Sequence, residues 1–148
     1  MPNFNIEKEF DKSIIGIDEV GRGPLAGPVV SCAFIFFDIN LISNELSFIN
    51  DSKKLSRKKR VLAIKEINKL KTQNKIKFSL GMANVNEIDR FNILEATKLS
   101  MCRAVKKLNQ PPTQLIIDGK IDLQLTRYPS KGIIKGDQKS YSIAAASI

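Results

Sequence analysis

The sequence contains no histidine and no tryptophan, and it has only two cysteines, Cys32 and Cys102. Without histidine, neither a Ser-His-Asp nor a Cys-His catalytic group can form, and no imidazole can act as a base or a metal ligand. Two cysteines alone cannot supply a four-ligand zinc site or a disulfide framework, so we interpret each as a small core residue. Any bound metal must therefore be held by oxygen, which favours Mg²⁺, Mn²⁺ or Ca²⁺.

Long hydrophobic runs are also missing. No apolar stretch approaches the ~20 residues that a membrane-spanning helix requires, and the first ten residues lack the apolar core of a secretion signal. With 148 residues, of which 43% are hydrophobic and 26% charged, the chain is expected to form one folded domain over residues 1–148. We expect a cytoplasmic monomer that does not associate with membranes.

Acidic residues are fewer than basic residues, and the whole difference falls in one segment of the chain. The chain has 24 basic and 15 acidic residues, a net charge of +9. Residues 51–77 carry 11 basic and two acidic residues, whereas the remainder carries 13 of each sign. Such a concentration is typical of proteins that bind nucleic-acid phosphates. A compositional explanation stays open, because lysine outnumbers arginine 18 to 6, as an AT-rich genome would produce without any function.

Apolar strands alternate with amphipathic helices along the chain, which predicts an α/β fold with a sheet flanked by helices. Strands are predicted over residues 13–17, 29–37, 76–82, 115–117 and 133–135. One helix is predicted from a cap at Ser56 to about Gln73. A second is predicted to start at a capping box formed by Asn92 and Glu95 and to end near residue 108. We expect the inner face of the first helix to contain Val61, Ile64, either Ile67 or Asn68, and Leu70. That of the second should contain Leu94, Met101, Val105 and Leu108.

Acidic side chains follow two of the predicted strands. Asp18 and Glu19 come directly after the first strand, and Asp118 closes another strand before Gly119. Carboxylates at the ends of neighbouring strands can converge at one sheet edge and hold hard cations. Two such cations can promote phosphodiester hydrolysis. The alternative also stays open, because an aspartate before a glycine is commonly only a turn residue.

A glycine-rich turn, residues 21–28, follows the first pair of carboxylates. Its three glycines allow the backbone to approach a ligand closely, and its amide groups could bind a phosphate or a sugar hydroxyl. The spacing fits neither a Walker loop nor a dinucleotide fingerprint. By itself the turn is a weak functional signal.

A set of ordered motifs is similar to those of type 2 ribonuclease H, the ribonuclease HII family. The motifs are Gly16–Val30, Asp51–Ser56, Glu87–Asp89 with Asn92–Leu94, Ile116–Gly119, Lys135–Asp137 and Ser142–Ile148. They cover nearly the whole chain from residue 14 onward. The resemblance implies a ribonuclease H-like fold, with a mixed central sheet flanked by helices.

The resemblance also implies an activity. Members of this family hydrolyse the RNA strand of RNA–DNA hybrids and cut on the 5′ side of ribonucleotides embedded in duplex DNA. A two-metal mechanism with Mn²⁺ or Mg²⁺ leaves a 3′-hydroxyl and a 5′-phosphate. By motif, the resemblance assigns three groups: catalytic metal ligands (Asp18, Glu19 and Asp118), readers of the ribose 2′-hydroxyl (Gly21, Arg22 and Gly23), and contacts to substrate phosphates (Ser52, Lys53 and Lys54).

The final residues of the sequence depart from the family pattern. Ser140–Ile148 is small and apolar, and it stops without the glycine or basic residues that usually close a helix. In the family, a fourth active-site aspartate and C-terminal helices carrying a substrate-binding tyrosine follow this point. We therefore expect a C-terminally incomplete chain, lacking those helices, with weak or no activity. Two alternatives stay open: a non-catalytic basic nucleic-acid-binding domain, and the product of a degraded gene that does not fold.

Overall fold

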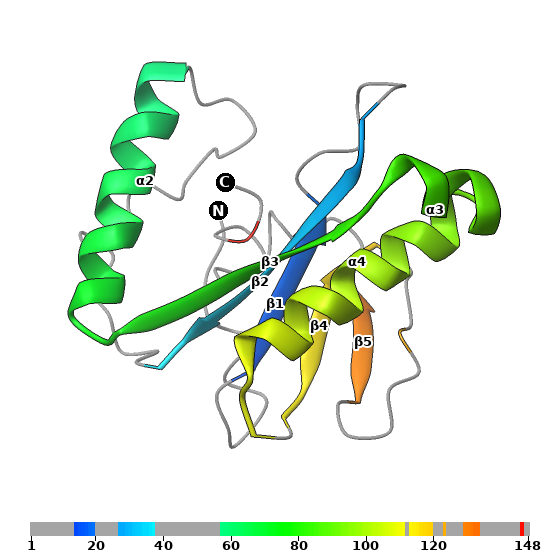
Figure 1. Cartoon of the computed structure of the whole chain (residues 1–148). Coiled ribbons are helices and arrows are strands. Elements are labelled where there is room, and N and C mark those ends of the chain that lie inside the picture. Colours follow the sequence, from blue (N-terminus) through cyan, green and yellow to red (C-terminus); the bar gives the residue numbers. More distant parts are fainter. Residues whose placement is uncertain are drawn as a thin grey trace.

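The structure of the protein is a computed structural model. It describes residues 14–19, 27–37, 57–111, 113–119, 123, 129–133 and 146. Within it, one five-stranded sheet has the strand order β3-β2-β1-β4-β5 (Figure 1). The strands are β1 (Ile15–Glu19), β2 (Val29–Phe36), β3 (Ile76–Ala83), β4 (Leu115–Asp118) and β5 (Ser130–Ile133). The helices are α2 (Arg57–Thr72), α3 (Val85–Phe91) and α4 (Ile93–Leu108). The predicted mixed sheet flanked by helices is confirmed.

Strand β1 lies at the centre of the sheet. It pairs antiparallel with β2, which pairs antiparallel with β3. On its other side β1 pairs parallel with β4, and β4 pairs parallel with β5. The C-terminal ends of β1 and β4 therefore meet at one edge of the sheet, which we call the carboxylate edge because Asp18, Glu19 and Asp118 end these strands.

The main core lies between α4 and one face of the sheet. Successive strand residues point to opposite faces, and the residues that point toward α4 form one buried cluster: Ile15, Ile17, Ala33, Ile35, Leu115 and Ile117 from the strands, and Met101, Ala104, Val105 and Leu108 from α4. Each large member contributes about 1.5–3 kcal/mol through burial. Leu94, predicted on this inner face, is instead exposed, because the buried face of α4 starts one half-turn later, at Ala96.

The contact between α4 and the strands β2 and β3 is made by small residues. The Ser31 and Ser100 hydroxyls are 2.6 Å apart, and the Ser100 hydroxyl donates to the Thr97 carbonyl. The Ser79 hydroxyl donates to the Ala104 carbonyl at 2.5 Å. These hydroxyls are buried, and their hydrogen bonds offset the cost of removing them from water. Small side chains thus let the helix backbone approach the sheet closely.

Helix α2 packs against β3 on the opposite face of the sheet. The Phe34 and Phe78 rings on this face are stacked with centroids 6.0 Å apart, and the Lys71 ammonium lies 5.0 Å from the Phe78 ring centre. The buried residues of α2 are Ala63, Ile67 and Leu70. Val61 and Ile64, predicted on the inner face, are about half exposed. Those two predictions were wrong because the pattern gave weight to large apolar residues, whereas the sheet packs against a stripe that includes the small Ala63.

Helix α3 was not predicted from the sequence. Asn84 starts it with a full capping box, in which the Asn84 side chain accepts from the Glu87 amide and the Glu87 side chain accepts from the Asn84 amide. Asn92 caps α4 as predicted, by accepting from the Glu95 amide at 3.0 Å. The Asn92 amide donates to the carbonyl of Ile88, so only half of the predicted box is present there.

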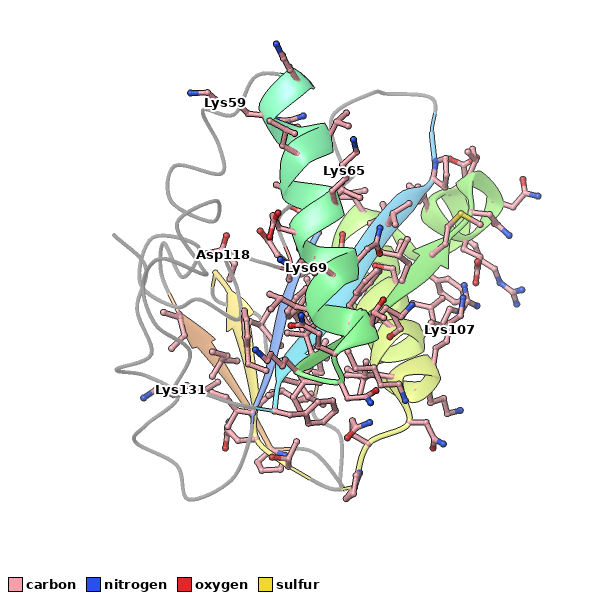
Figure 2. The ribbon with its side chains drawn as sticks, turned by 90° about the vertical axis from the view of Figure 1, so that its left-hand side faces the viewer. Lys59, Lys65, Lys69, Lys107, Asp118 and Lys131 are labelled. Atoms are coloured by element: carbon pink, nitrogen blue, oxygen red, sulfur yellow. The ribbon has the colours of Figure 1, made fainter. Side chains whose placement is uncertain are left out.

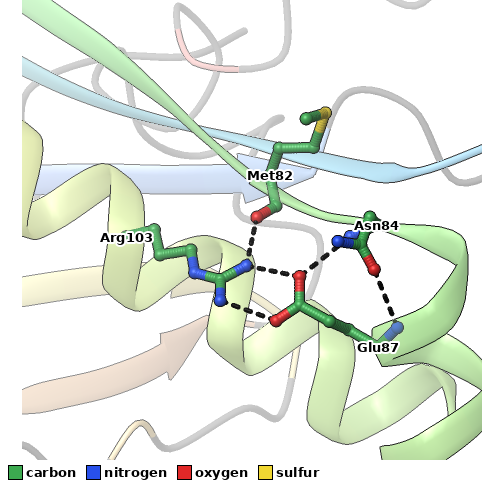
Figure 3. A network of polar contacts seen from close by, with 4 residues as sticks. All are labelled: Met82, Asn84, Glu87 and Arg103. Carbon is green, nitrogen blue, oxygen red and sulfur yellow. Dashed lines mark hydrogen bonds and ion pairs between the residues drawn. The ribbon is translucent and has the colours of Figure 1, made fainter.

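A network of polar contacts links β3, α3 and α4 (Figure 3). Arg103 of α4 donates to both carboxylate oxygens of Glu87, at 2.7 and 2.6 Å, and to the Met82 carbonyl at 2.7 Å. The hydrogen bonds from Arg103, followed by the one from the Asn84 amide, lower the pKa of Glu87 to about 2. One guanidinium group therefore ties together β3, α3 and α4.

Replacing this arginine is expected to give a pH-dependent loss of stability. Because the pKa of Glu87 falls from 4.5 to about 2 on folding, its charged form stabilises the protein above about pH 4.5, and that contribution is lost as the pH falls through about 2. Arg103→Gln should lower the free energy of unfolding near pH 7, and its difference from wild type should shrink on acidification. Urea unfolding across this range measures the effect.

A suitable control is Lys98→Gln, which removes the exposed Lys98–Glu95 ion pair of the same helix. That variant should stay close to wild type across the range. A difference between Arg103→Gln and wild type that did not change with pH would show that the guanidinium acts only through its bond to Met82 and its packing.

Of three further sequence predictions, one is settled in part and two are not tested. The last strand, predicted over residues 133–135, is β5 and ends at Ile133. The helix start near Ser140 and the cap at Ser56 lie outside the described residues. In the ranges that are described, no helix has the length and hydropathy needed to cross a membrane.

Candidate active site

Asp18 and Asp118 occupy neighbouring positions at the carboxylate edge. The last registered pair between β1 and β4 is Ile17 opposite Ile117, and the next residue on each strand is the aspartate. Adjacent strands lie about 4.8 Å apart, so the two residues are neighbours. Both point to the sheet face opposite α4, since Ile17 and Ile117 point toward α4. Figure 2 shows Asp118 projecting from the end of β4.

The immediate surroundings of Asp18 restrict its carboxylate. Its Oδ1 atom accepts a hydrogen bond from the Glu19 amide at 2.9 Å. Cys32 lies directly opposite Asp18 on β2, and burial, together with the negative charge of Asp18, raises the pKa of its thiol to about 12. In the absence of metal the thiol is therefore protonated at neutral pH. The prediction that Cys32 is a core residue is confirmed, while Cys102 is half-buried.

Asp118 is both a strand end and a turn residue. Gly119 has a φ of 97°, a conformation that residues with side chains rarely adopt. Its amide donates to the Ile133 carbonyl of β5 at 2.8 Å. The glycine therefore turns the chain directly after Asp118 and keeps β4 and β5 paired up to the carboxylate edge.

Glu19 follows Asp18 as the last residue of β1. Strand alternation directs it toward the α4 face, where its partner across β2 is the buried Ser31. One of its carboxylate oxygens, Oε2, is fully buried. Among the residues that the structure describes, no group of three or more acidic, cysteine or histidine side chains is close enough to hold a metal. Strand register thus places Asp18 and Asp118 at neighbouring backbone positions, while the Glu19 side chain starts from the other face of β1.

The other predicted site residues lie outside the described part of the chain. These are the predicted readers of the 2′-hydroxyl and the predicted phosphate contacts: Gly21, Arg22, Gly23, Ser52, Lys53 and Lys54. In the sequence, the first group precedes β2, which begins at Val29, and the second group precedes α2, which begins at Arg57.

Two features near the carboxylates were missed by the sequence analysis. Cys32 lies beside Asp18, which depends on a strand register that no local pattern reveals. The described basic residues of the first turn of α2 (Lys58, Lys59 and Arg60) are all exposed and share the turn with no acidic residue. The helix that carries them was predicted, but the face of the sheet on which it packs was not.

The donor set fits a hard divalent cation better than any other group. Asp18 and Asp118 offer carboxylate oxygens from adjacent backbone positions, which is the ligand type that Mg²⁺ and Mn²⁺ prefer. Burial and the negative charge of Asp18 raise the pKa of the adjacent Cys32 thiol, which makes it a poorer ligand than the two carboxylates. Two like charges side by side are also costly unless a cation or other positive group compensates them.

A family model described as Ribonuclease HII matches residues 15–148. The chain belongs to the ribonuclease HII family. Its relatives include the ribonuclease HII of Wolbachia pipientis subsp. Culex pipiens (strain wPip), with 46% identity over 99% of this chain and 70% of the relative. The ribonuclease HII of Orientia tsutsugamushi (strain Ikeda) is 47% identical over 99% of this chain and 67% of the relative.

Solved structures share the fold of this chain. The ribonuclease H2 of Pyrococcus horikoshii OT3 superimposes with a TM-score of 0.69 at 23% identity, over 91% of this chain and 68% of the other. Bst-RNase HIII, solved in complex with Mn²⁺, gives a TM-score of 0.61 at 20% identity, over 92% and 49% of the two chains. As a ribonuclease HII family member, the protein is a ribonuclease H-type hydrolase, and the ribonuclease H-like fold expected from its motifs is confirmed.

Proposed function

We propose that this ribonuclease HII family member is a metal-dependent endonuclease for RNA–DNA hybrids and for single ribonucleotides embedded in duplex DNA. The observation that carries the proposal is the placement of Asp18 and Asp118 side by side at the C-terminal ends of two parallel strands. Membership of the family supplies the reaction class. The cut is placed on the 5′ side of the ribonucleotide and leaves a 3′-hydroxyl and a 5′-phosphate.

In this proposal Asp18 and Asp118 hold Mn²⁺ or Mg²⁺, and Glu19 joins them as a third ligand. Glu19 is the last residue of β1, so its longer side chain must reach the cation around the end of the strand. When bound, the cations supply an activated water and stabilise the departing oxygen. The Mn²⁺ complex of Bst-RNase HIII, a protein with the same fold, supports this choice of cation.

The remaining roles are assigned by motif. The backbone of Gly21, Arg22 and Gly23 reads the ribose 2′-hydroxyl, which is the group that distinguishes RNA from DNA. Ser52, Lys53 and Lys54 hold the phosphates beside the cut. The strong positive charge of residues 51–77 supports this partner, because it matches a polyphosphate backbone.

The test is a nicking assay on duplex DNA that contains one ribonucleotide. We expect a single cut 5′ of the ribonucleotide with Mn²⁺ or Mg²⁺, no cut after chelation of the metal, and no cut in the all-DNA duplex. The 3′-hydroxyl is checked by extension of the nick with a DNA polymerase. Cleavage of the all-DNA duplex, or cleavage without divalent metal, would contradict the proposal.

The alternative of a non-catalytic basic nucleic-acid-binding domain is tested by the same substrate. It predicts a gel shift of the duplex with no metal-dependent nick. The neighbouring positions of Asp18 and Asp118 favour the nuclease, because a domain that only binds phosphates gains nothing from two negative charges on the face it presents.

A further inference from the structure

We propose that the outer edge of β3 binds an extended acidic segment of a partner protein, which adds to the sheet as a further strand. Three features of β3 carry this proposal: its position in the sheet, the apolar side chains beside its outer edge, and the positive charge around its start. None of them depends on the proposed nuclease function.

Strand β3 lies at one edge of the sheet (Figure 1). Among the residues that the structure describes, it pairs with β2 alone. It is eight residues long, whereas β5, the strand at the other edge, has four. A long edge strand presents a row of backbone amides and carbonyls to which another strand can bind. The sheet is therefore extended most readily at β3.

The hydrogen-bonding pattern identifies the backbone groups of β3 that point outward. The Phe37 amide donates to the Lys75 carbonyl, and these two residues continue the register in which Phe36 stands opposite Ile76. In an antiparallel pair, positions that bond to the partner strand alternate with positions whose amides and carbonyls point away from it. Counting along β3 from Lys75, the outward positions include residues 78, 80 and 82.

Arg103 agrees with this assignment and limits the length of the binding edge. Its guanidinium donates to the Met82 carbonyl at 2.7 Å, so the outward carbonyl at this position is already bound. Phe78 and Leu80 precede Met82 in the strand. An added strand would therefore form its hydrogen bonds with the amides and carbonyls of Phe78 and Leu80.

Leu80 and Met82 offer apolar side chains to such a strand. Both lie on the sheet face opposite α4, because the intervening Gly81 faces α4. They are 49% and 52% exposed. Large apolar side chains beside an exposed strand edge favour pairing with another chain. An apolar side chain opposite Leu80 on the added strand would pack against it and cover it.

Positive charge surrounds the start of the strand. Residues 67–82 contain four lysines and no acidic residue. The Lys71 ammonium lies 5.0 Å from the ring centre of Phe78, one of the outward positions. Lys77 is next to Phe78 in the strand, so its side chain starts from the other face of the sheet. A carboxylate on either face of the added strand would thus meet a lysine, which favours an acidic partner.

The same charge disfavours a second copy of this chain as the occupant. Two β3 edges related by a two-fold axis would pair antiparallel. Because Arg103 occupies the Met82 carbonyl, the longest such pairing is centred on Phe78. It would place the Lys77 residues of the two copies diagonally across from each other, and like charges at that spacing destabilise a strand pair. An acidic segment gains the same backbone hydrogen bonds without this repulsion.

The experiment titrates the full chain, labelled with nitrogen-15, with synthetic peptides up to about 1 mM and follows the amide resonances. One eight-residue peptide alternates valine with glutamate, and a charge-reversed peptide alternates valine with lysine. We expect the glutamate peptide to shift the resonances of Phe78 and Leu80 and to bind at least about 10-fold more tightly at low salt. This preference should shrink as salt is added.

Leu80→Pro tests the backbone contact. It removes the outward amide but no hydrogen bond to β2, and proline is tolerated in an edge strand in this orientation. We expect it to bind the glutamate peptide at least about 10-fold more weakly, because one hydrogen bond is lost and the ring obstructs the added strand. Leu80→Ala keeps the amide and should weaken binding by about three- to tenfold. Its matched control is Leu94→Ala, a leucine of α4 that is 47% exposed, which should bind like wild type.

Two double variants with equal loss of charge test the lysines. Lys71→Gln with Lys77→Gln should remove most of the preference for the glutamate peptide. Lys58→Gln with Lys131→Gln removes two exposed charges at the start of α2 and on β5. This control should keep the preference within about twofold of wild type. Equal effects of the two double variants would show that the peptide responds only to net charge, and would overturn the proposal.

Hydrogen exchange of the wild-type chain tests the proposal even if Leu80→Pro does not fold. Bound glutamate peptide should slow exchange of the Phe78 and Leu80 amides and leave the amides of β5 unchanged. The proposal would be overturned by a glutamate peptide that does not bind, by equal binding of both peptides, or by a folded Leu80→Pro variant that binds like wild type. Dimerisation of the chain that Leu80→Pro abolishes would also overturn it, because the occupant would then be a second copy.

Discussion

Asp18→Asn is expected to reduce metal-dependent cleavage of an RNA–DNA hybrid by about 100-fold or more while leaving hybrid binding largely intact. The amide keeps the size of the side chain but removes the charge that attracts the cation. Loss of a group that only supports a metal ligand already costs 10- to 100-fold in affinity or activity, and Asp18 is proposed to be a ligand itself. Single-turnover cleavage in Mn²⁺ and anisotropy binding without metal measure the two quantities.

The matched control for this variant is Asp89→Asn. Asp89 is an exposed aspartate of α3, so its replacement makes the same chemical change away from the carboxylate edge. It should cleave at the wild-type rate. If Asp18→Asn lost hybrid binding together with cleavage, Asp18 would be a structural residue. If it cleaved like wild type, the assignment of Asp18 as a metal ligand would be wrong.

Gly81→Ala is expected to destabilise the protein by more than about 3 kcal/mol, or to prevent it from folding. Gly81 is buried in β3 and faces α4 across from Ser31. A Cβ atom at this position would overlap the Ser100 carbonyl oxygen and the Ala104 amide nitrogen of α4, and would lie 3.0 Å from the Ala104 Cα. These are backbone atoms that cannot rotate away, so the helix itself would have to move. Typical overpacking costs about 1–3 kcal/mol, and it costs more where the obstacle cannot yield.

Gly27→Ala provides the control for a general cost of replacing glycine. Among the residues that the structure describes, a Cβ atom at Gly27 would meet no atom within 4 Å. Its free energy of unfolding should therefore stay within about 1 kcal/mol of wild type, or rise slightly because alanine restricts the unfolded chain. Urea denaturation and thermal melting compare both variants with wild type. A cooperative melt of Gly81→Ala near the wild-type Tm would show that α4 can move away from β3 at little cost.

The positions of most strands and helices could be predicted from the sequence because they depend on local patterns. The apolar run of β2 and the alternation of β3 give strands whatever surrounds them. Asn92 marks the start of α4 because its side chain accepts a hydrogen bond from the amide of Glu95, three residues later in the same turn. Helix α3 escaped prediction because it has only seven residues and no buried side chain, so its sequence shows no hydrophobic periodicity.

The inner faces of the helices were harder to predict than their ends. The sequence favours large apolar residues as core, yet Val61, Ile64 and Leu94 are exposed and Ala63 is buried. Which stripe of a helix is covered depends on where the sheet lies beneath it. The close approach of α4 to Gly81, and the hydroxyl pair of Ser31 and Ser100, likewise arise from contacts between segments far apart in the chain.

The sequence by itself determined the chemistry open to this protein. The lack of histidine and of paired cysteines leaves carboxylate oxygens as metal ligands, the ordered motifs give the ribonuclease HII family, and the charge of residues 51–77 gives a phosphate-rich partner. Only the tertiary structure decided which of the acidic residues lie at neighbouring positions. Asp18 and Asp118 are 100 residues apart and become neighbours through the parallel pairing of β1 and β4, whereas Glu19, next to Asp18 in the chain, points to the other face. The physical reason is that composition and motifs are properties of the chain, while proximity across a sheet is set by strand register and by the alternation of side chains.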